Sequence, residues 1–237
     1  MILFRSALFN IFFFAGTFVL TLVGSVVAVF APHRALAFAQ GWARLMLWSA
    51  HTICGIRWQI VGKLPDGAAV IASHHESTFD TLLWLAILPR PAYVMKQELQ
   101  RIPLFGRLTR LAGMIAVDRS AGVRAMRRLM RDAAAAAAEQ RQIVIFPEGT
   151  RAAPGTLLPL HPGVAAVAAG TRLPVIPVLT DSGRCWGRRA FRKQPGLIQV
   201  VLLPPLRNTA QRDLLRLLQQ ALQTDLKTAT SVENSVG

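Results

Sequence analysis

Ser73-His74-His75-Glu76-Ser77-Thr78-Phe79-Asp80-Thr81 stands between a short apolar run, residues 68–72, and a helix-like run, residues 82–88. This arrangement predicts a turn from a strand into a helix, and such turns place side chains at the open end of an α/β sheet, where ligands bind. His75 and Asp80 are expected to converge there. An imidazole can take a proton from a hydroxyl, and a carboxylate on its other nitrogen fixes the tautomer. The pair therefore predicts a general base and the group that orients it.

The same stretch also permits a purely structural interpretation. Ser77 or Thr78 would then cap the helix, beside a histidine on the surface. Ser77 does not lie in a Gly-x-Ser-x-Gly elbow, which is the usual setting of a serine nucleophile in α/β hydrolases. Transfer to an external hydroxyl is therefore favoured over an acyl-enzyme.

Further blocks follow the first motif in a fixed order. They are Lys96-Gln97-Glu98-Leu99 with Pro103 and Gly106, Gly113 to Arg119, Phe146-Pro147-Glu148-Gly149-Thr150-Arg151, and Val175-Ile176-Pro177-Val178. This set resembles the glycerolipid acyltransferase family over roughly residues 60–203, and the bacterial lysophosphatidate acyltransferases resemble it most. Phe-Pro-Glu-Gly-Thr-Arg is its most specific block.

The resemblance implies that an acyl group passes from acyl-CoA or acyl-carrier protein to the free hydroxyl of lysophosphatidate, giving phosphatidate. It implies His75 as the base and Asp80 as its partner, with no metal and no cofactor besides the acyl donor. Arg151 is the first candidate for the acceptor's phosphate, because a guanidinium matches phosphate bidentately. Lys96 and Arg119 are further candidates from their own blocks, and a solvated surface position is the alternative for Arg119.

Glu148 and Gly149 belong to the same substrate-binding loop by this resemblance. A carboxylate repels an anionic substrate, so Glu148 is expected to orient Arg151 or the loop, and Gly149 permits a tight turn. The residue before the catalytic histidine is often Asn or Lys in the family and is His74 here. His74 is either a donor behind the base or a strand-end residue, and we favour the second interpretation.

The composition points to a membrane surface. The chain has 237 residues, of which 52% are hydrophobic, and carries a net charge of +15 with only 16% charged residues. Its mean hydropathy is +0.38. Apolar and basic together are typical of proteins that lie on a membrane, whereas the sequence shows no zinc-finger, RNP-like or helix-turn-helix pattern that would indicate nucleic acid. Cys54 and Cys185 are isolated, which argues against a disulfide framework or a zinc site and fits a reducing compartment.

The chain divides into membrane-anchoring helices over residues 1–54, an acyltransferase domain over 55–227 and a flexible tail over 228–237. Residues 7–31 form an apolar stretch, about 37 Å long as a helix, which Pro32 separates from a second apolar stretch, residues 35–54. We favour a helical hairpin lying in one leaflet. The alternatives are a first helix that spans the bilayer, a secretory signal, and a second helix packed on the domain. One stripe of the second helix is polar and suits the interface: Gln40, Arg44 and His51.

Short apolar runs alternate with helix candidates after residue 56. This alternation predicts an α/β domain with a mixed, largely parallel sheet and flanking helices, preceded by the N-terminal membrane-associated hairpin. The predicted strands are 57–61, 68–73, 92–96, 114–117, 142–146, 175–179 and 197–203. The predicted helices of the domain are 82–88, 102–111, 121–141 and 210–226.

Two basic groups lie outside these motifs. The first is a helical stripe that is either solvated or docked on an anionic leaflet: Arg124, Arg127, Arg128 and Arg131. The second is a patch that suits lipid headgroups, coenzyme A phosphates or an acidic carrier protein: Arg184, Arg188, Arg189, Arg192 and Lys193, with Trp186 and Phe191. The strand 175–178 either lines the acyl chain or is simply buried.

Two classes of function remain open from the sequence. The first is a membrane enzyme on the cytoplasmic side of the inner membrane, acting on lysophosphatidate or on another lyso-lipid such as lyso-ornithine lipid or lysophosphatidylglycerol. The second is a non-catalytic membrane-associated scaffold. The presence of His75, Asp80 and Arg151 together favours the enzyme.

Overall fold

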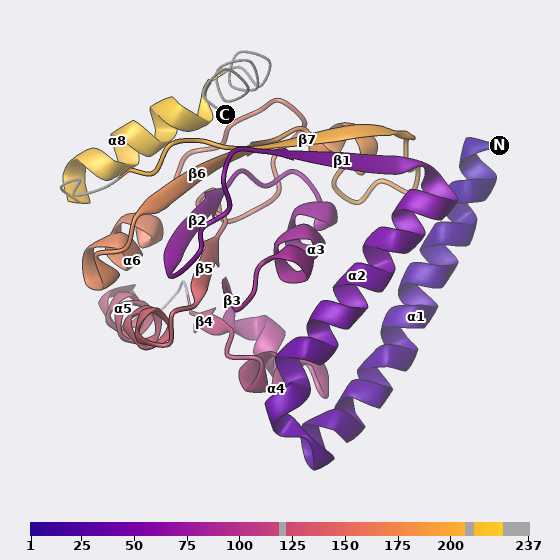
Figure 1. Ribbon diagram of the computed structural model, residues 1–237, viewed down its shortest axis with the longest axis horizontal. Coiled ribbons are helices and arrows are strands. Elements are labelled where there is room, and N and C mark those ends of the chain that lie inside the picture. The colour runs from indigo at the N-terminus through magenta and orange to yellow at the C-terminus, as the bar shows by residue number, and fades with distance from the viewer. Residues whose placement is uncertain (119–121, 207–210, 225–237) are drawn as a thin grey trace.

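One mixed sheet organises the domain. In the computed structural model, which describes residues 1–118, 122–206 and 211–224, seven strands pair in the order β1-β7-β6-β2-β5-β3-β4 (Figure 1). The pairing is parallel except between β6 and β7. The sequence predicts every one of these strands to within one residue at each end, and the largely parallel sheet is confirmed. The strands are β1 Ile56–Val61, β2 Ala69–Ser73, β3 Pro91–Lys96, β4 Ile115–Val117, β5 Gln142–Ile145, β6 Val175–Thr180 and β7 Gly196–Leu202.

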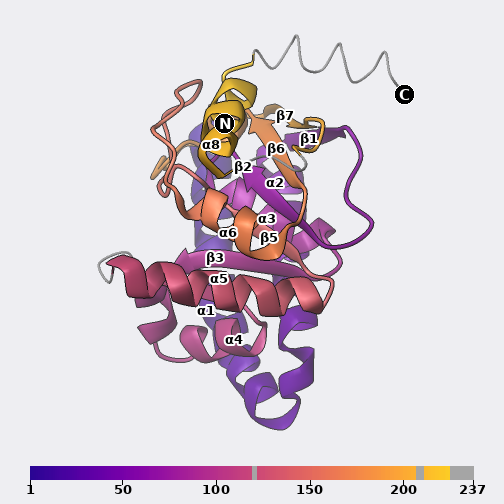
Figure 2. The same cartoon turned by 90° about the vertical axis from the view of Figure 1, so that its left-hand side faces the viewer.

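Helices cover both faces of the sheet. Helices α1, α2 and α3 pack on one face, around a core that contains Ile71 of β2 and Trp84 of α3. Helices α5, α6 and α8 cover the other face (Figure 2). Val70 and Ala72 of the same strand belong to the core between that face and these helices. The helices are α1 Ile2–Phe30, η1 Pro32–Arg34, α2 Ala35–Cys54, α3 Thr78–Ile87, η2 Gln97–Arg101, α4 Phe105–Leu111, α5 Gly122–Ala138, α6 Gly163–Thr171, α7 Ser182–Cys185 and α8 Gln211–Leu222.

The sequence pattern misses α6 and α7 and places α3 too late. Helix α6 consists of small and apolar residues without a polar face, so it lacks the periodicity that marks an amphipathic helix. Helix α3 begins at Thr78, four residues before the predicted start, because Ser77 caps it and Asp80 completes a capping box. The first turn of α3 therefore contains the second half of the His75–Asp80 motif.

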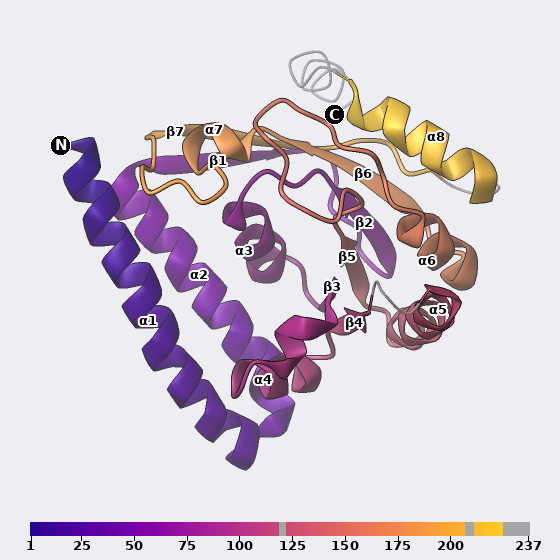
Figure 3. The same ribbon diagram turned by 180° about the vertical axis from the view of Figure 1, so that it is seen from behind.

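The N-terminal hairpin runs along one side of the domain. Helices α1 and α2 lie side by side and antiparallel, joined through η1 (Figure 3). Among the described residues, α1 is the helix that is long and apolar enough to cross a membrane. Its outer face is apolar and exposed, through Leu3, Phe4, Leu8, Ile11, Phe14, Phe18, Val19, Leu22, Val23, Val26, Val29 and Phe30.

Part of the polar stripe of α2 bonds to the domain. Gln40 Nε2 donates to the Leu88 carbonyl over 2.8 Å, and Arg44 Nε donates to the Ala86 carbonyl over 3.2 Å. Leu45 and Trp48 are the large apolar side chains of α2 that are exposed. The prediction that this stripe lies at the interface is wrong for Gln40, which is buried, whereas Arg44 and His51 are exposed. The last carbonyls of a helix lack intrahelical donors, and the end of α3 finds them on α2.

Two predictions fall outside the described residues. These are the role of Arg119 and the flexible tail over residues 228–237. The predicted C-terminal helix is present as α8. The division of the chain at residues 54 and 227 stays a prediction.

Candidate active site

The site forms where two neighbouring parallel strands end. Strand β2 runs beside β5, with Ala72 paired to Ile145, so the segments that follow both strands leave the sheet at the same edge. His75 follows β2, and the loop from Phe146 to Arg151 follows β5. Parallel pairing thus brings the first motif and the Phe-Pro-Glu-Gly-Thr-Arg block together at the carboxyl edge, where α/β sheets bind ligands.

His75 and Asp80 form the expected pair. Nδ1 of His75 lies 3.1 Å from Oδ2 of Asp80, whose side chain is 2% exposed. The same oxygen accepts the backbone N–H groups of Glu76, over 2.9 Å, and of Ser77, over 2.8 Å. The helix cap and the histidine partner are therefore one carboxylate. The alternative of a surface histidine is wrong, since the His75 side chain is 14% exposed.

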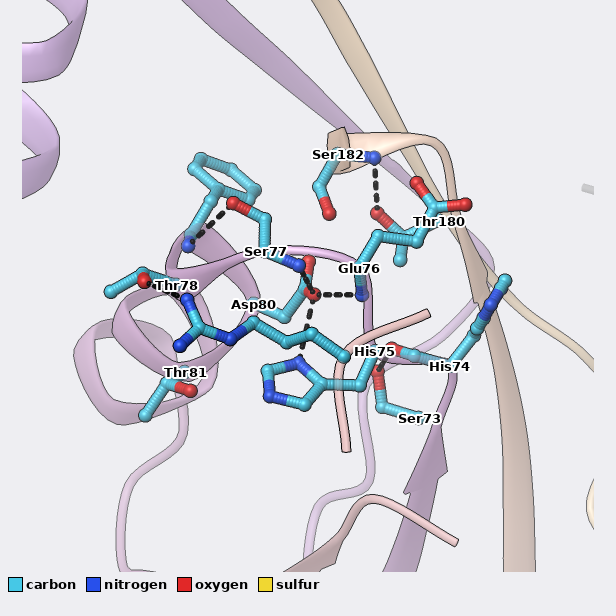
Figure 4. A network of polar contacts seen from close by, with 12 residues as sticks. Ser73, His74, His75, Glu76, Ser77, Thr78, Asp80, Thr81, Thr180 and Ser182 are labelled. Atoms are coloured by element: carbon cyan, nitrogen blue, oxygen red, sulfur yellow. Dashed lines mark hydrogen bonds and ion pairs between the residues drawn. The ribbon is translucent and has the colours of Figure 1, made fainter. Parts of the chain in front are cut away.

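This contact fixes how the imidazole presents itself. A carboxylate on Nδ1 favours the tautomer that carries its proton there, which leaves Nε2 with a lone pair. Figure 4 shows one ring nitrogen of His75 joined to Asp80 and the other turned away from it. The ring also stacks on Phe146, with centroids 3.9 Å apart and planes 18° apart. His75 is thus held on two sides and free to accept a proton on the third.

A cavity of about 440 Å³ opens in front of His75. Its walls come from the hairpin, α3, β3, η2, α4 and the loop after β5. Most of its lining is apolar, and a smaller part is polar or comes from the loop after β5. The apolar part includes Leu20, Phe38, Trp42, Leu85, Tyr93, Phe105, Leu108 and Met114, and the other part includes Lys96, Gly149, Thr150 and Arg151.

Positive charge collects around Arg151. Its Nη1 donates to Thr78 Oγ1 over 2.9 Å, and Nη1 of Arg188 donates to the Arg151 carbonyl over 3.3 Å. Burial, and then the charges of Arg188 and Arg189, lower the pKa of the Arg151 guanidinium. Guanidinium groups that crowd one another in this way are stabilised by an anion.

Glu148 points away from the cavity. Its Oε2 accepts the His75 N–H over 2.9 Å, and its Oε1 accepts the Leu158 N–H over 3.1 Å. The side chain of Glu148 is fully buried, and its Oε1 lies 3.3 Å from Nε2 of His74. Glu148 therefore ties the loop to the strand that carries His75, and His74 is its partner. Our preference for His74 as a mere strand-end residue is wrong.

Comparison with known proteins identifies the family. A family model described as "Acyltransferase" matches residues 55–181, more than half of the chain. The chain belongs to the acyltransferase family. The match contains β2, the His75–Asp80 motif and the loop from Phe146 to Arg151.

The relatives of this acyltransferase are named after a specific substrate. The chain is 32% identical over 206 residues to a 1-acyl-sn-glycerol-3-phosphate acyltransferase of Pseudomonas aeruginosa, covering 85% of this chain and 80% of the relative. It is 32% identical to the enzyme of that name from Cocos nucifera, covering 69% of this chain and 53% of the relative. The mouse alpha enzyme is 31% identical, with coverages of 69% and 59%. The chain thus spans only a little over half the length of the plant and mouse relatives.

A solved structure confirms the fold. The crystal structure of the 1-acyl-sn-glycerophosphate (LPA) acyltransferase PlsC from Thermotoga maritima matches with a TM-score of 0.70 at 18% identity. The match covers 96% of this acyltransferase and 95% of that chain. The hairpin and the domain are therefore parts of one shared architecture.

Several contacts of this acyltransferase have no local sequence signal. Thr78, Phe146 and Arg188 meet Arg151 or His75 from elements that are far apart in the chain. Lys193, predicted as part of a surface patch, is 3% exposed. Its Nζ donates to Asn10 Oδ1 over 3.1 Å, so this part of the patch prediction is wrong. The reason is that α1 covers Lys193 and supplies its partner.

Proposed function

We propose that this acyltransferase moves a fatty acyl group from acyl-CoA or acyl-carrier protein to the free hydroxyl of lysophosphatidate, giving phosphatidate. The observation that carries the proposal is the single cavity shared by His75 and Arg151. A base fixed by Asp80 and an arginine in a cluster of positive charge face the same space. An acceptor with a hydroxyl near a phosphate meets both requirements.

In the proposed reaction, Nε2 of His75 removes the acceptor's hydroxyl proton as the oxygen attacks the thioester carbonyl carbon. Asp80 stabilises the imidazolium that forms, while the tetrahedral intermediate collapses and expels the thiolate. The proton on His75 passes to the departing sulfur. The reaction therefore uses the side chains of this chain and its two substrates, without a further cofactor.

Each remaining part of the cavity has a role in this proposal. Arg151 binds the acceptor's phosphate, and Lys96, which also lines the cavity, adds positive charge. Gly149, at φ +68, gives the loop a turn that other residues adopt at a cost. The apolar walls between the hairpin and α4 suit an acyl chain, because they shield it from water.

The hairpin supports attachment to one leaflet. Near its start, α1 is bound to the domain, since Asn10 Nδ2 donates to the Phe191 carbonyl over 2.9 Å. Near its end, Gly24 packs closely on Phe38 and on Leu108 of α4. A helix docked at both ends cannot cross the bilayer without drawing Arg107 and other charged groups into hydrocarbon, at about 3 kcal/mol for each. We propose a domain on the cytoplasmic side whose hairpin lies in the adjoining leaflet.

Single-cysteine labelling tests this topology. Leu3→Cys and Phe30→Cys, each in a Cys54→Ser/Cys185→Ser background, mark the two ends of α1. With a hairpin in one leaflet, a membrane-impermeant maleimide labels both positions from the cytoplasmic side of inverted vesicles and neither from the outer side. Labelling of the two ends from opposite sides contradicts the proposal and indicates a span.

The reaction is tested by substrate competition in detergent. Labelled acyl-CoA and acyl-carrier protein are each offered with lysophosphatidate, lyso-ornithine lipid or lysophosphatidylglycerol, using wild type, His75→Ala and the exposed control His33→Ala. We expect phosphatidate from wild type and the control but not from His75→Ala. If another acceptor is preferred, the proposed mechanism stands and the proposed substrate changes. If no pair gives a product, the result supports a non-catalytic membrane-associated scaffold.

A further inference from the structure

A second buried histidine lies directly behind the catalytic one. His74 is 6% exposed, and Figure 4 shows its ring pointing away from that of His75. Nε2 of His74 lies 3.3 Å from Glu148 Oε1 and 3.2 Å from the Thr156 carbonyl oxygen. Since these neighbours accept and do not donate, Nε2 carries a proton whatever the charge of the ring.

Glu148 links this ring to the candidate active site. Glu148 accepts the backbone N–H of His75 and the backbone N–H of Leu158, so it fixes the strand end and the returning loop together. The loop between these contacts contains Gly149 and Arg151, which line the cavity. A shift of Glu148 therefore moves the base and the phosphate-binding arginine relative to each other.

Buried negative charge surrounds His74. Glu148 faces it from the loop after β5, and Glu76, 1% exposed, faces it from its own turn. Asp80, from α3, is joined to His75 on the other side of the chain. A buried carboxylate without a positive partner is costly, so Glu148 gains most when the His74 ring is charged.

We propose that His74, as an imidazolium, is a positioning residue that holds Glu148 and with it the relative placement of His75 and Arg151, and that loss of its proton at alkaline pH weakens this placement. The proposal rests on the proposed function of His75. It assigns to His74 an effect on the reaction without contact with substrate.

The surroundings of His74 shift its pKa in the direction that the proposal requires. Burial by itself lowers the pKa of the His74 imidazolium, but the hydrogen bond and charge of Glu148, together with the charge of Glu76, raise it above its usual 6.5. A pKa that is higher in the folded than in the unfolded state adds stability that is fully present below pH 6.5. This stability is lost as the pH rises through the folded value. The expected window of loss is therefore the alkaline side of 6.5.

Two substitutions separate charge from hydrogen bonding. His74→Lys supplies a cation that persists to about pH 10. His74→Gln supplies a neutral N–H donor of similar reach. We expect kcat/KM of wild type for the acceptor to fall about fivefold to tenfold as the pH rises above 6.5. His74→Lys should show no such fall. His74→Gln should have a kcat/KM that is lower than the acid-side value of wild type by a similar factor at every pH. Below pH 6.5 the lysine variant should match wild type.

A second measurement does not depend on activity. The Tm of wild type in detergent should decrease by about 3 °C relative to that of His74→Gln as the pH rises from 6 to 9. This Tm difference is expected even if the chain acts on another acceptor or on none. Failure of the proposed function can therefore be told apart from failure of the proposal for His74. If His74→Lys does not fold, the comparison of wild type with His74→Gln decides. The proposal is overturned if kcat/KM of all three proteins falls in the same way above pH 6.5. It is also overturned if the Tm difference between wild type and His74→Gln does not change with pH.

Discussion

The catalytic corner and the hairpin junction are both held by polar side chains, but these side chains bond to different partners. In the catalytic corner, residues 74–80 with 148–151, side chains bond chiefly to one another and to the turn that carries them. In the hairpin junction, polar side chains of α1 and α2 reach backbone carbonyls of the domain. These side chains are Asn10, Gln40 and Arg44.

The difference shows what each region has to fix. In the proposed reaction the corner sets the position of the reacting atoms, and its hydrogen bonds to His75 reach the backbone N–H and Nδ1, which leaves Nε2 for the substrate. The junction is otherwise an apolar contact between helices, which has no strong preference for one register. A few directional bonds to fixed carbonyls select that register, as buried polar residues do in coiled coils. Loss of a group in the corner should therefore cost activity, and loss of one in the junction should cost stability.

The largest expected effect is that of Asp80→Asn. The amide cannot stabilise an imidazolium and favours the wrong tautomer, so kcat should fall about 10³-fold. Tm should change by a few degrees at most, because Asn keeps an oxygen for the helix cap. The measurement is single-turnover acyl transfer with thermal unfolding in parallel. Asp66→Asn, on an exposed side chain, is the control. A fall in kcat below tenfold contradicts the role of Asp80.

Arg151→Gln is expected to act on the acceptor. Loss of the charged fork should raise the acceptor KM about 10- to 100-fold, with a smaller change in kcat and in the KM for the donor. Initial rates measured over both substrate concentrations give these values. Arg57→Gln, on an exposed position of β1, serves as the matched control. An effect confined to the donor KM would assign Arg151 to the thioester substrate instead.

Lys193→Met tests the hairpin junction. Nζ of Lys193 donates to the Ala190 carbonyl over 2.6 Å and to Asn10 Oδ1 over 3.1 Å, and lies 5.4 Å from the Trp186 ring centroid. Methionine fills the space but leaves the acceptors without this donor, so the free energy of unfolding should fall by about 2 kcal/mol. This corresponds to a Tm lower by about 6 °C.

The same variant also separates stability from activity. Below its Tm, Lys193→Met should keep kcat within about threefold of wild type, because its contacts fix the hairpin and not the reacting atoms. Lys63→Met, at a side chain that is 83% exposed, should change neither quantity. A large loss of kcat without a loss of Tm would show that the two regions are not separable.

The smallest expected effect is that of Gln40→Leu. The substitution removes the donor to the Leu88 carbonyl and should lower the free energy of unfolding by about 1 kcal/mol. Chemical denaturation in detergent measures this, beside Gln59→Leu on the exposed face of β1. Greater stability of Gln40→Leu than of wild type would mean that apolar packing alone fixes α2 on α3.

The sequence by itself determined the sheet and the contact between His75 and Asp80. Its strands are short apolar runs bounded by turn residues, which is a local signal, and their ends are predicted to within one residue. The His75–Asp80 pair is also local, because a five-residue spacing across a capped helix start brings the two side chains together. The family resemblance then assigned a chemistry to that pair.

Only the tertiary structure decided which polar residues are partners. Glu148 meets His75 across 73 positions in sequence, and Lys193 meets Asn10 across 183. A lone polar residue on an apolar helix has the same local pattern whether it meets water, a lipid headgroup or a buried carbonyl. The choice depends on which unpaired group packing brings within hydrogen-bond distance. Gln40 and Lys193 therefore turn inward, and His74 gains a carboxylate, for reasons that lie in distant parts of the chain.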